Sequence, residues 1–173
     1  MESNHENTRL FERLFQEHAG FVWRVLRRLG VQDGELEDAV QEVFIVVVSK
    51  LAEYDERGAV RAWLFTIARQ VASHFRRARM RLANKEQALR VSAAATSASD
   101  PHASIEASSL VHKFLAKLEP EQAMVFYLSD VEGMSAPEIS VALQLNLTTV
   151  QGRLRLARKH FEARVRTYQK ATR

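Results

Sequence analysis

The sequence predicts an all-α protein made of two small helical domains joined by a flexible linker rich in Ala and Ser. Along most of its 173 residues, apolar side chains recur at steps of three and four, as the buried stripe of a helix requires. This periodicity stops between residues 92 and 104, where small residues dominate, and it resumes at Leu110. We therefore expect domains at residues 8–82 and 110–168, with the linker at 83–109.

The N-terminal domain is expected to contain three helices. The first ends near Gly30, a residue type that commonly follows helix C-termini. The second runs from about Leu36 to Leu51; its segment Val43–Val48 also has the β-branched composition of a buried strand, but the flanking acids and Leu51 keep the helical period. After a loop at residues 53–58, a third helix follows. Its apolar face consists of Val60, Trp63, Leu64, Ile67, Val71, Phe75 and Leu82.

Two capping signals near the C-terminus predict a pair of short helices joined by a tight turn, after an upstream helix that opens at Pro120. Ser135 and Glu138 have the spacing of a capping box, and Pro137 fits the first turn of the same helix. Asn146 is a suitable N-cap for the second helix. The buried stripes would be Ile139, Ala142 and Leu143 in the first helix, and Val150, Leu154, Ala157 and Phe161 in the second. This is the pattern of a helix-turn-helix.

The outward face of the second helix carries polar and cationic side chains. They are Thr148, Gln151, Gly152, Arg155, Arg158 and Lys159. In a DNA major groove, Gln and Arg can bond to base edges, and Lys or Arg can neutralise phosphates. The same pattern also fits a helical hairpin with a solvated basic face, because Gln144 stands where many helix-turn-helix motifs place a turn glycine.

Charge is distributed unevenly along the chain, although the net charge is only +4. Arg69 to Arg81 holds five basic residues and no acid, and residues 150–173 hold eight basic residues against Glu162. Residues 31–56 reverse the balance, with eight acids against one lysine. Phosphate would repel the acidic segment, so we expect it to face a protein partner or solvent.

Several function classes are excluded by residue types. The absence of cysteine excludes disulfides, thiolate metal sites and cysteine nucleophiles. The six histidines lack ligand spacing, so we expect no metal and no other cofactor. No catalytic constellation or glycine-rich phosphate loop is present, which argues against an enzyme. The six-residue apolar run at residues 43–48 is too short to cross a bilayer and the N-terminus is polar, so we expect a cytoplasmic protein without membrane insertion.

These residues together resemble the extracytoplasmic-function (group IV) sigma factors of the sigma-70 family of bacterial RNA polymerase. Residues 37–44 are similar to the acidic polymerase-binding helix of that family, and residues 61–69 to the start of its promoter-melting helix. Residues 118–126, 132–139 and 149–154 are similar to its second conserved domain. The resemblance covers nearly the whole chain. It implies a subunit that binds core polymerase and directs promoter-specific transcription initiation.

The resemblance also implies roles for particular residues. Core polymerase would be bound at the clamp helices of its largest subunit and at its flap, the clamp helices by Asp38, Gln41 and Glu42. The minus 10 element would be opened and held by Tyr54, Asp55, Arg57, Arg61, Trp63, Gln70, Ser73, His74 and Arg77. The minus 35 element would be bound by Thr148, Thr149, Gln151, Gly152, Arg153, Arg155, Arg158 and Lys159. An anti-sigma factor is a further candidate partner.

The chain departs from the usual family pattern at several of these positions. Gln70 and His74 stand where the family commonly has Asn and Asp, and Gln151 replaces a frequent Lys or Arg. Gly152 lies in mid-helix, and Val46 takes a position that is usually polar and could widen an apolar surface for a regulatory partner. An alternative function is a helix-turn-helix transcriptional regulator that acts without core polymerase. That alternative would leave the N-terminal domain without a task.

Overall fold

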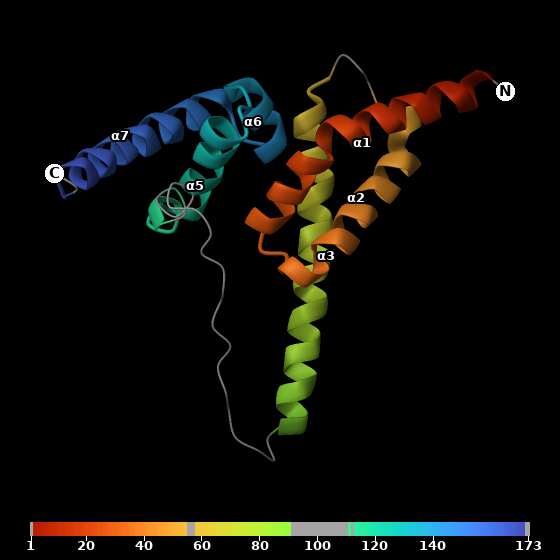
Figure 1. Ribbon diagram of the computed structural model, residues 1–173, viewed down its shortest axis with the longest axis horizontal. Helices are drawn as coiled ribbons and strands as arrows, with labels where there is room; N and C mark the ends of the chain where they lie inside the picture. Colours follow the sequence, from red (N-terminus) through yellow and green to blue (C-terminus); the bar gives the residue numbers. More distant parts are fainter. Residues whose placement is uncertain (1, 55–57, 91–110, 112, 172–173) are drawn as a thin grey trace. The chain divides into compact units, whose positions relative to one another are not determined.

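The computed structural model describes residues 2–54, 58–90, 111 and 113–171, and these residues form helices and turns without any strand (Figure 1). The chain divides into two compact units, Met1–Thr96 and Ser97–Arg173. The predicted all-α class with two helical domains is therefore confirmed.

The N-terminal unit is built from three helices, each packed against the other two. They are α1 (Glu2–Arg28), α2 (Leu36–Lys50) and α3 (Val60–Arg90), with short 3-10 turns η1 (Asp33–Glu35) and η2 (Leu51–Glu53) flanking α2. The segment Val43–Val48 is helical, as its flanking residues predict. One face of α2 buries Leu36, Ala39, Val43, Phe44 and Val47.

The turn after α1 has the bonding pattern of a Schellman motif. Gly30 has a φ of 89°, and its N–H donates to Arg27 O at 3.1 Å. The N–H of Val31 donates to Leu26 O at 3.1 Å. Because a side chain is disfavoured at this φ, glycine is the natural residue here, and the predicted cap is confirmed.

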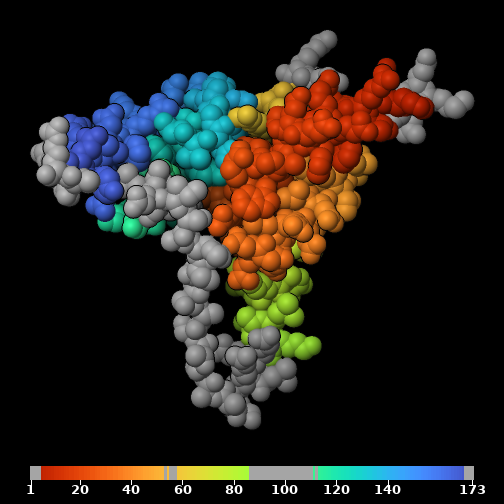
Figure 2. Space-filling model, viewed as in Figure 1, coloured from red at the N-terminus to blue at the C-terminus, as the bar shows by residue number. Residues whose placement is uncertain are grey.

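Helix α3 is longer than the sequence analysis predicts. Leu64, Ile67 and Val71 are buried as expected, but Leu82 is 63% exposed and the helix continues to Arg90. The green C-terminal turns of α3 project past α1 and α2 in Figures 1 and 2. The first residues of the predicted linker, 83–90, therefore belong to this helix, and the remaining linker residues lie outside the described part of the chain.

The C-terminal unit contains a helical segment at residues 113–115 and then four further elements. These are α5 (Pro120–Phe126), a π-helical segment η3 (Tyr127–Val131), α6 (Ala136–Leu143) and α7 (Leu147–Ala171). The rings of Phe114, Phe126 and Phe161 form a cluster with centroid separations of 5.2, 5.0 and 5.4 Å. This cluster joins the start of the unit to α5 and α7.

The helix-turn-helix is formed as the sequence predicts. Ser135 Oγ accepts the Glu138 N–H at 3.4 Å, and Glu138 Oε2 accepts the Ser135 N–H at 2.8 Å, which completes the capping box. Asn146 Oδ1 accepts the Thr149 N–H at 2.7 Å and caps α7. Most of the predicted stripe is buried: Ile139, Ala142, Val150, Leu154 and Ala157.

Candidate nucleic-acid and polymerase interfaces

The outward face of α2 combines acidic and apolar side chains. Asp38 and Gln41 are exposed, and Ile45 and Val48 beside them are 68% and 54% exposed. Positions three, four and seven residues apart share one face of a helix, so Ile45 lies on the same face as Asp38 and Gln41. Val46, the position expected to widen an apolar surface, is half-buried instead.

The two exposed apolar side chains were missed by the sequence analysis, although a signal for them was present. The segment Val43–Val48 has six consecutive apolar residues, and one buried face of a helix accommodates only about half of such a run. The others must face outward. Val43, Phe44 and Val47 are buried, whereas Ile45 and Val48 are exposed.

Glu42 and His74 lie together, although the resemblance assigns them to different partners. His74 Nδ1 and Glu42 Oε1 are 3.2 Å apart, and both side chains are partly exposed. This contact ties α2 to α3. An exposed pair of this kind contributes only about 0–1 kcal/mol to stability, so it links the two helices without determining their packing.

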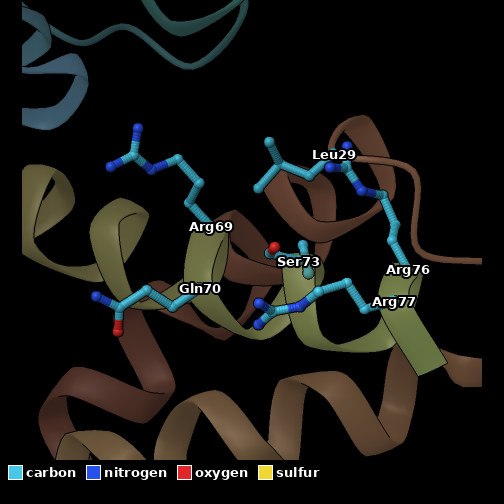
Figure 3. Close-up of a pocket in the computed structure, with 7 residues that line it drawn as sticks. Leu29, Arg69, Gln70, Ser73, Arg76 and Arg77 are labelled. Carbon is cyan, nitrogen blue, oxygen red and sulfur yellow. The ribbon is translucent and has the colours of Figure 1, made fainter.

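A cationic pocket lies between α3 and the end of α1. Its volume is about 390 Å³, and its lining includes the predicted residues Gln70, Ser73 and Arg77 (Figure 3). Arg69 and Arg76 also line it, and neither was singled out from the sequence as a site residue. The rest of the lining is apolar and consists of Leu29 and Ala72. Three guanidinium groups around a polar and apolar lining suit a single DNA strand, whose backbone phosphates are negatively charged and whose bases are unstacked.

The other residues predicted for the minus 10 element do not line this pocket. Tyr54 and Trp63 stack on each other with ring centroids 4.6 Å apart. The guanidinium of Arg61 lies 5.7 Å from the ring centroid of Phe21, in a cation–π contact. Asp55 and Arg57 fall at residues 55–57, which lie outside the described part of the chain.

The N-terminal half of α7 presents a polar face. Thr148, Gln151, Arg155 and Lys159 are exposed, whereas Thr149 and Gly152 are half-buried. A Cβ added to Gly152 would meet no atom within 4 Å, so the backbone there is open to a close approach from outside. The structure brings these six predicted residues together at the start of one helix.

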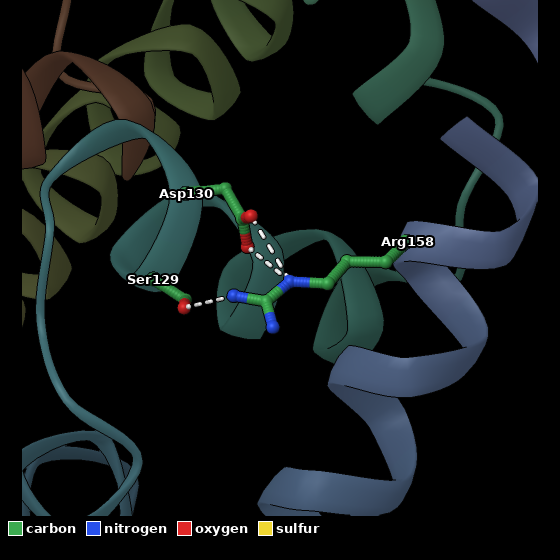
Figure 4. A network of polar contacts seen from close by, with 3 residues as sticks. All are labelled: Ser129, Asp130 and Arg158. Atoms are coloured by element: carbon green, nitrogen blue, oxygen red, sulfur yellow. Dashed lines mark hydrogen bonds and ion pairs between the residues drawn. The ribbon is translucent and has the colours of Figure 1, made fainter. Parts of the chain in front are cut away.

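Two arginines predicted on the same helix are bound within the unit. Arg153 pairs with Glu121 at the start of α5, and its side chain is only 25% exposed. Arg158 Nε donates to Asp130 Oδ1 at 3.0 Å, and its Nη2 donates to Ser129 Oγ at 3.2 Å (Figure 4). Both partners are distant in sequence, so local patterns gave no signal for either pair.

Among the described residues, no cluster of three or more His, Asp or Glu side chains is arranged to hold a metal ion. None of the helices described is both long and apolar enough to span a membrane.

Comparison with known proteins decides the family. The chain matches the models of Sigma-70 region 2 over residues 14–82 and of Sigma-70, region 4 over residues 108–161. It is 30% identical over 166 residues to the RNA polymerase sigma factor CnrH of Cupriavidus metallidurans, covering 91% of this chain and 87% of that protein. This chain belongs to the RNA polymerase sigma factors.

Further similarity places the sigma factor in the extracytoplasmic-function class. The ECF RNA polymerase sigma factor SigL of Mycobacterium tuberculosis is 30% identical over 150 residues, which cover 86% of this chain and 84% of SigL. The solved structure of CnrH in complex with the cytosolic domain of CnrY has a TM-score of 0.63 at 26% identity, covering 92% of this chain and 90% of CnrH. The chain is thus a polymerase-binding initiation factor with the domains of its class.

Proposed function

We propose that this sigma factor binds core polymerase through the outward face of α2. Asp38 and Gln41 are exposed beside the apolar Ile45 and Val48. Carboxylates complement a basic protein surface, and exposed apolar side chains favour a partner that removes them from water. A phosphate backbone would be repelled by the same carboxylates. Glu42 belongs to this face at its edge, where it also contacts His74.

The pocket between α3 and the end of α1 is proposed to hold the opened minus 10 strand. Arg69, Arg76 and Arg77 supply charge for phosphates, and Gln70 and Ser73 supply hydrogen-bonding groups for base edges. The observation that carries this assignment is that no described residue of α2 lines the pocket. One unit can therefore bind polymerase and an opened strand at the same time.

The start of α7 is proposed to read the minus 35 element. The reading face consists of Thr148, Thr149, Gln151, Gly152, Arg155 and Lys159. Gln151 and Arg155 have the donors and acceptors that bond to base edges, and Lys159 suits a phosphate. Arg153 and Arg158 are left out of this face because Glu121 and Asp130 engage them.

Regulation by a protein partner is proposed for the same α2 face. CnrH, a relative of this chain, has been solved with the cytosolic domain of CnrY. An anti-sigma factor that covered Ile45 and Val48 would compete directly with core polymerase. The proposed place of action is the cytoplasm, and the proposed activity is initiation by binding, without catalysis by this chain.

The test of the α2 assignment is a core-binding assay with charge-reversed variants. Asp38→Arg should weaken the affinity for core polymerase at least tenfold, because like charges brought together at an interface cost several kcal/mol. Glu6→Arg makes the same change of net charge on an exposed residue of α1 and should bind core as the wild type does. Circular dichroism checks that both variants remain helical.

One outcome would reject the assignment of α2, and another would reject polymerase binding by the chain as a whole. Wild-type affinity in Asp38→Arg would show that α2 does not face polymerase. A wild-type chain that captured promoter duplex but no core polymerase would instead support the regulator without polymerase binding.

A further inference from the structure

Asp130 pairs with Arg158, a cation of α7, although the arginine side chain remains 51% exposed. Arg158 Nε lies 3.0 Å from Asp130 Oδ1 and 3.3 Å from Oδ2. Arg158 Nη2 adds a hydrogen bond to Ser129 Oγ at 3.2 Å. Figure 4 shows the guanidinium extending from α7 to these two residues of η3. Three contacts from one planar group fix its orientation more firmly than a single ion pair would.

The acceptor segment is itself held in place. Tyr127 donates its hydroxyl proton to Glu132 Oε1 at 2.7 Å, and both side chains are buried. Ser129 and Asp130 lie between these two anchored residues, in the π-helical segment η3. The Tyr127–Glu132 hydrogen bond therefore holds the backbone of η3, and with it the position of Asp130 beside α7.

Helical geometry places Arg158 at the edge of the proposed reading face, next to Gln151. At about 100° per residue, Thr148, Gln151, Arg155 and Lys159 fall within an arc of roughly 80°. Arg158 lies about 60° from the centre of that arc, toward the buried stripe. The arginine is thus close enough to the face to reach a phosphate if it were released, but Asp130 and Ser129 engage its guanidinium.

Arg153 is neutralised in the same manner on the opposite flank of α7, by Glu121. Four cations lie between residues 148 and 159, namely Arg153, Arg155, Arg158 and Lys159. Two of the four are paired with acids of the same unit, and Arg155 and Lys159 stand on the exposed face. The positive charge that α7 offers to DNA is smaller than its sequence indicates.

We propose that Asp130 limits the overall affinity of α7 for DNA: by engaging Arg158, it reduces the attraction of α7 for phosphates of any sequence. The proposal rests on the assignment of α7 to the minus 35 element. Phosphate attraction is independent of sequence, whereas Gln151 and Arg155 can distinguish bases. An additional free cation would strengthen binding to every duplex by about the same factor and would leave the preference for the promoter unchanged.

The test compares the salt dependence of holoenzyme binding to a promoter and to the same fragment with a scrambled minus 35 element. Asp130→Asn should increase the steepness of log K against log salt by about 0.9, because one more cation can reach a phosphate. That change corresponds to about a 3.5-fold greater loss of affinity between 50 and 200 mM salt. Both fragments should gain affinity by about the same factor, so the ratio of the two should stay as in the wild type.

Neighbouring cations provide the matched comparison. Lys159→Ala should make the salt dependence shallower by about 0.9, whereas Arg158→Ala should leave it as in the wild type. The double variant with Asp130→Asn and Arg158→Ala should lose the extra steepness of Asp130→Asn. Thermal unfolding of each variant establishes that it is folded.

The outcomes separate this inference from the proposed function. If Arg158→Ala makes the salt dependence as shallow as Lys159→Ala does, Arg158 contacts DNA and the inference is overturned. Unchanged steepness in Asp130→Asn overturns it as well. If Lys159→Ala and Arg155→Ala both bind the promoter as the wild type does, the assignment of α7 to the minus 35 element fails instead.

Discussion

At the scale of single residues, the turn between α6 and α7 depends on an unusual conformation of Gln144. It is the one non-glycine residue with positive φ in the described ranges, with φ and ψ of 56° and 42°. Leu145 N–H donates to Ser140 O at 3.1 Å, and Gln144 N–H donates to Val141 O at 3.3 Å, so the turn is a Schellman motif like the one after α1. Glycine would suit this position better than glutamine.

Gln144→Gly should therefore stabilise the C-terminal unit. A Cβ in the left-handed region costs about 1–2 kcal/mol, and the added freedom of glycine in the unfolded chain offsets about 0.5–1 kcal/mol of that. The free energy of unfolding should rise by up to about 1 kcal/mol, as measured by urea denaturation. Gln144→Ala keeps the Cβ and serves as the control. Equal stability of the two variants would argue against strain at this residue.

His18 gives the N-terminal unit a predicted sensitivity to acid. Burial lowers the pKa of His18 below its ordinary value of 6.5; Glu17 opposes this shift, and the positive charge of Arg61 adds to it. Below about pH 6.5 the unfolded chain therefore binds more protons at this residue than the folded chain does, so stability falls as pH falls.

Replacing His18 by Gln should remove that part of the pH dependence. The wild type should lose more free energy of unfolding than His18→Gln between pH 7.5 and 5.5. Burial disfavours protonation of His18 in the folded wild type, whereas glutamine does not titrate. The exposed His160 provides the control variant, His160→Gln, which should follow the wild type. Parallel curves for all three proteins would show that His18 does not contribute.

The residues that the sequence predicted correctly are those whose partners are local. Ser135 and Glu138 lie three residues apart, and the same spacing separates Asn146 from Thr149. Arg158 and Asp130 are separated by 28 positions. Their contact depends on how α7 packs against η3, and no periodic pattern contains that information.

At the scale of helices, Gly152 is an apparent weakness in α7. Glycine in a helix interior costs about 1 kcal/mol relative to alanine, and the space around its Cα is open within the unit. Nothing in the fold of the unit requires glycine here. Its place beside Gln151 on the proposed reading face gives a functional reason, which is close approach of DNA to the backbone.

Gly152→Ala should accordingly raise the stability of the C-terminal unit and weaken its binding to DNA. The free energy of unfolding should rise by about 1 kcal/mol, while the affinity of holoenzyme for a promoter with an intact minus 35 element should fall. Gly20→Ala in α1 is the matched control, because an added Cβ there meets only the flexible end of Arg24, at 3.3 Å. If Gly152→Ala binds the promoter like the wild type, DNA does not approach this part of the helix.

The ends of helices were harder to predict than their faces. The apolar stripe of α3 weakens after Phe75, yet residues 83–90 are Ala, Asn, Lys, Glu, Gln, Ala, Leu and Arg, most of which favour helix. The composition shift toward Ala and Ser begins only at residue 92. Intrinsic helix propensity thus extends α3 beyond the residues that packing would require.

At the scale of the whole molecule, the chain separates its proposed contacts between two units. The α2 face and the Arg69–Arg77 pocket belong to the first unit, and the α7 face belongs to the second. The sequence predicted this division because apolar periodicity stops between the units. It did not predict the full lining of the pocket, because that lining depends on how the end of α1 packs against α3. Changes in different units should act independently, and changes in contacting residues should not.

Double-mutant cycles test that expectation. The losses of promoter affinity caused by Arg77→Ala and Lys159→Ala in holoenzyme should add within about 0.5 kcal/mol, because the residues share no partner. The losses of unfolding free energy caused by Glu42→Ala and His74→Ala should be less than additive, because the two side chains are 3.2 Å apart and either change removes the same contact. A coupling energy well above 0.5 kcal/mol between Arg77 and Lys159 would mean that the two promoter elements are not bound independently, and the assignment of one element to each unit would have to be abandoned.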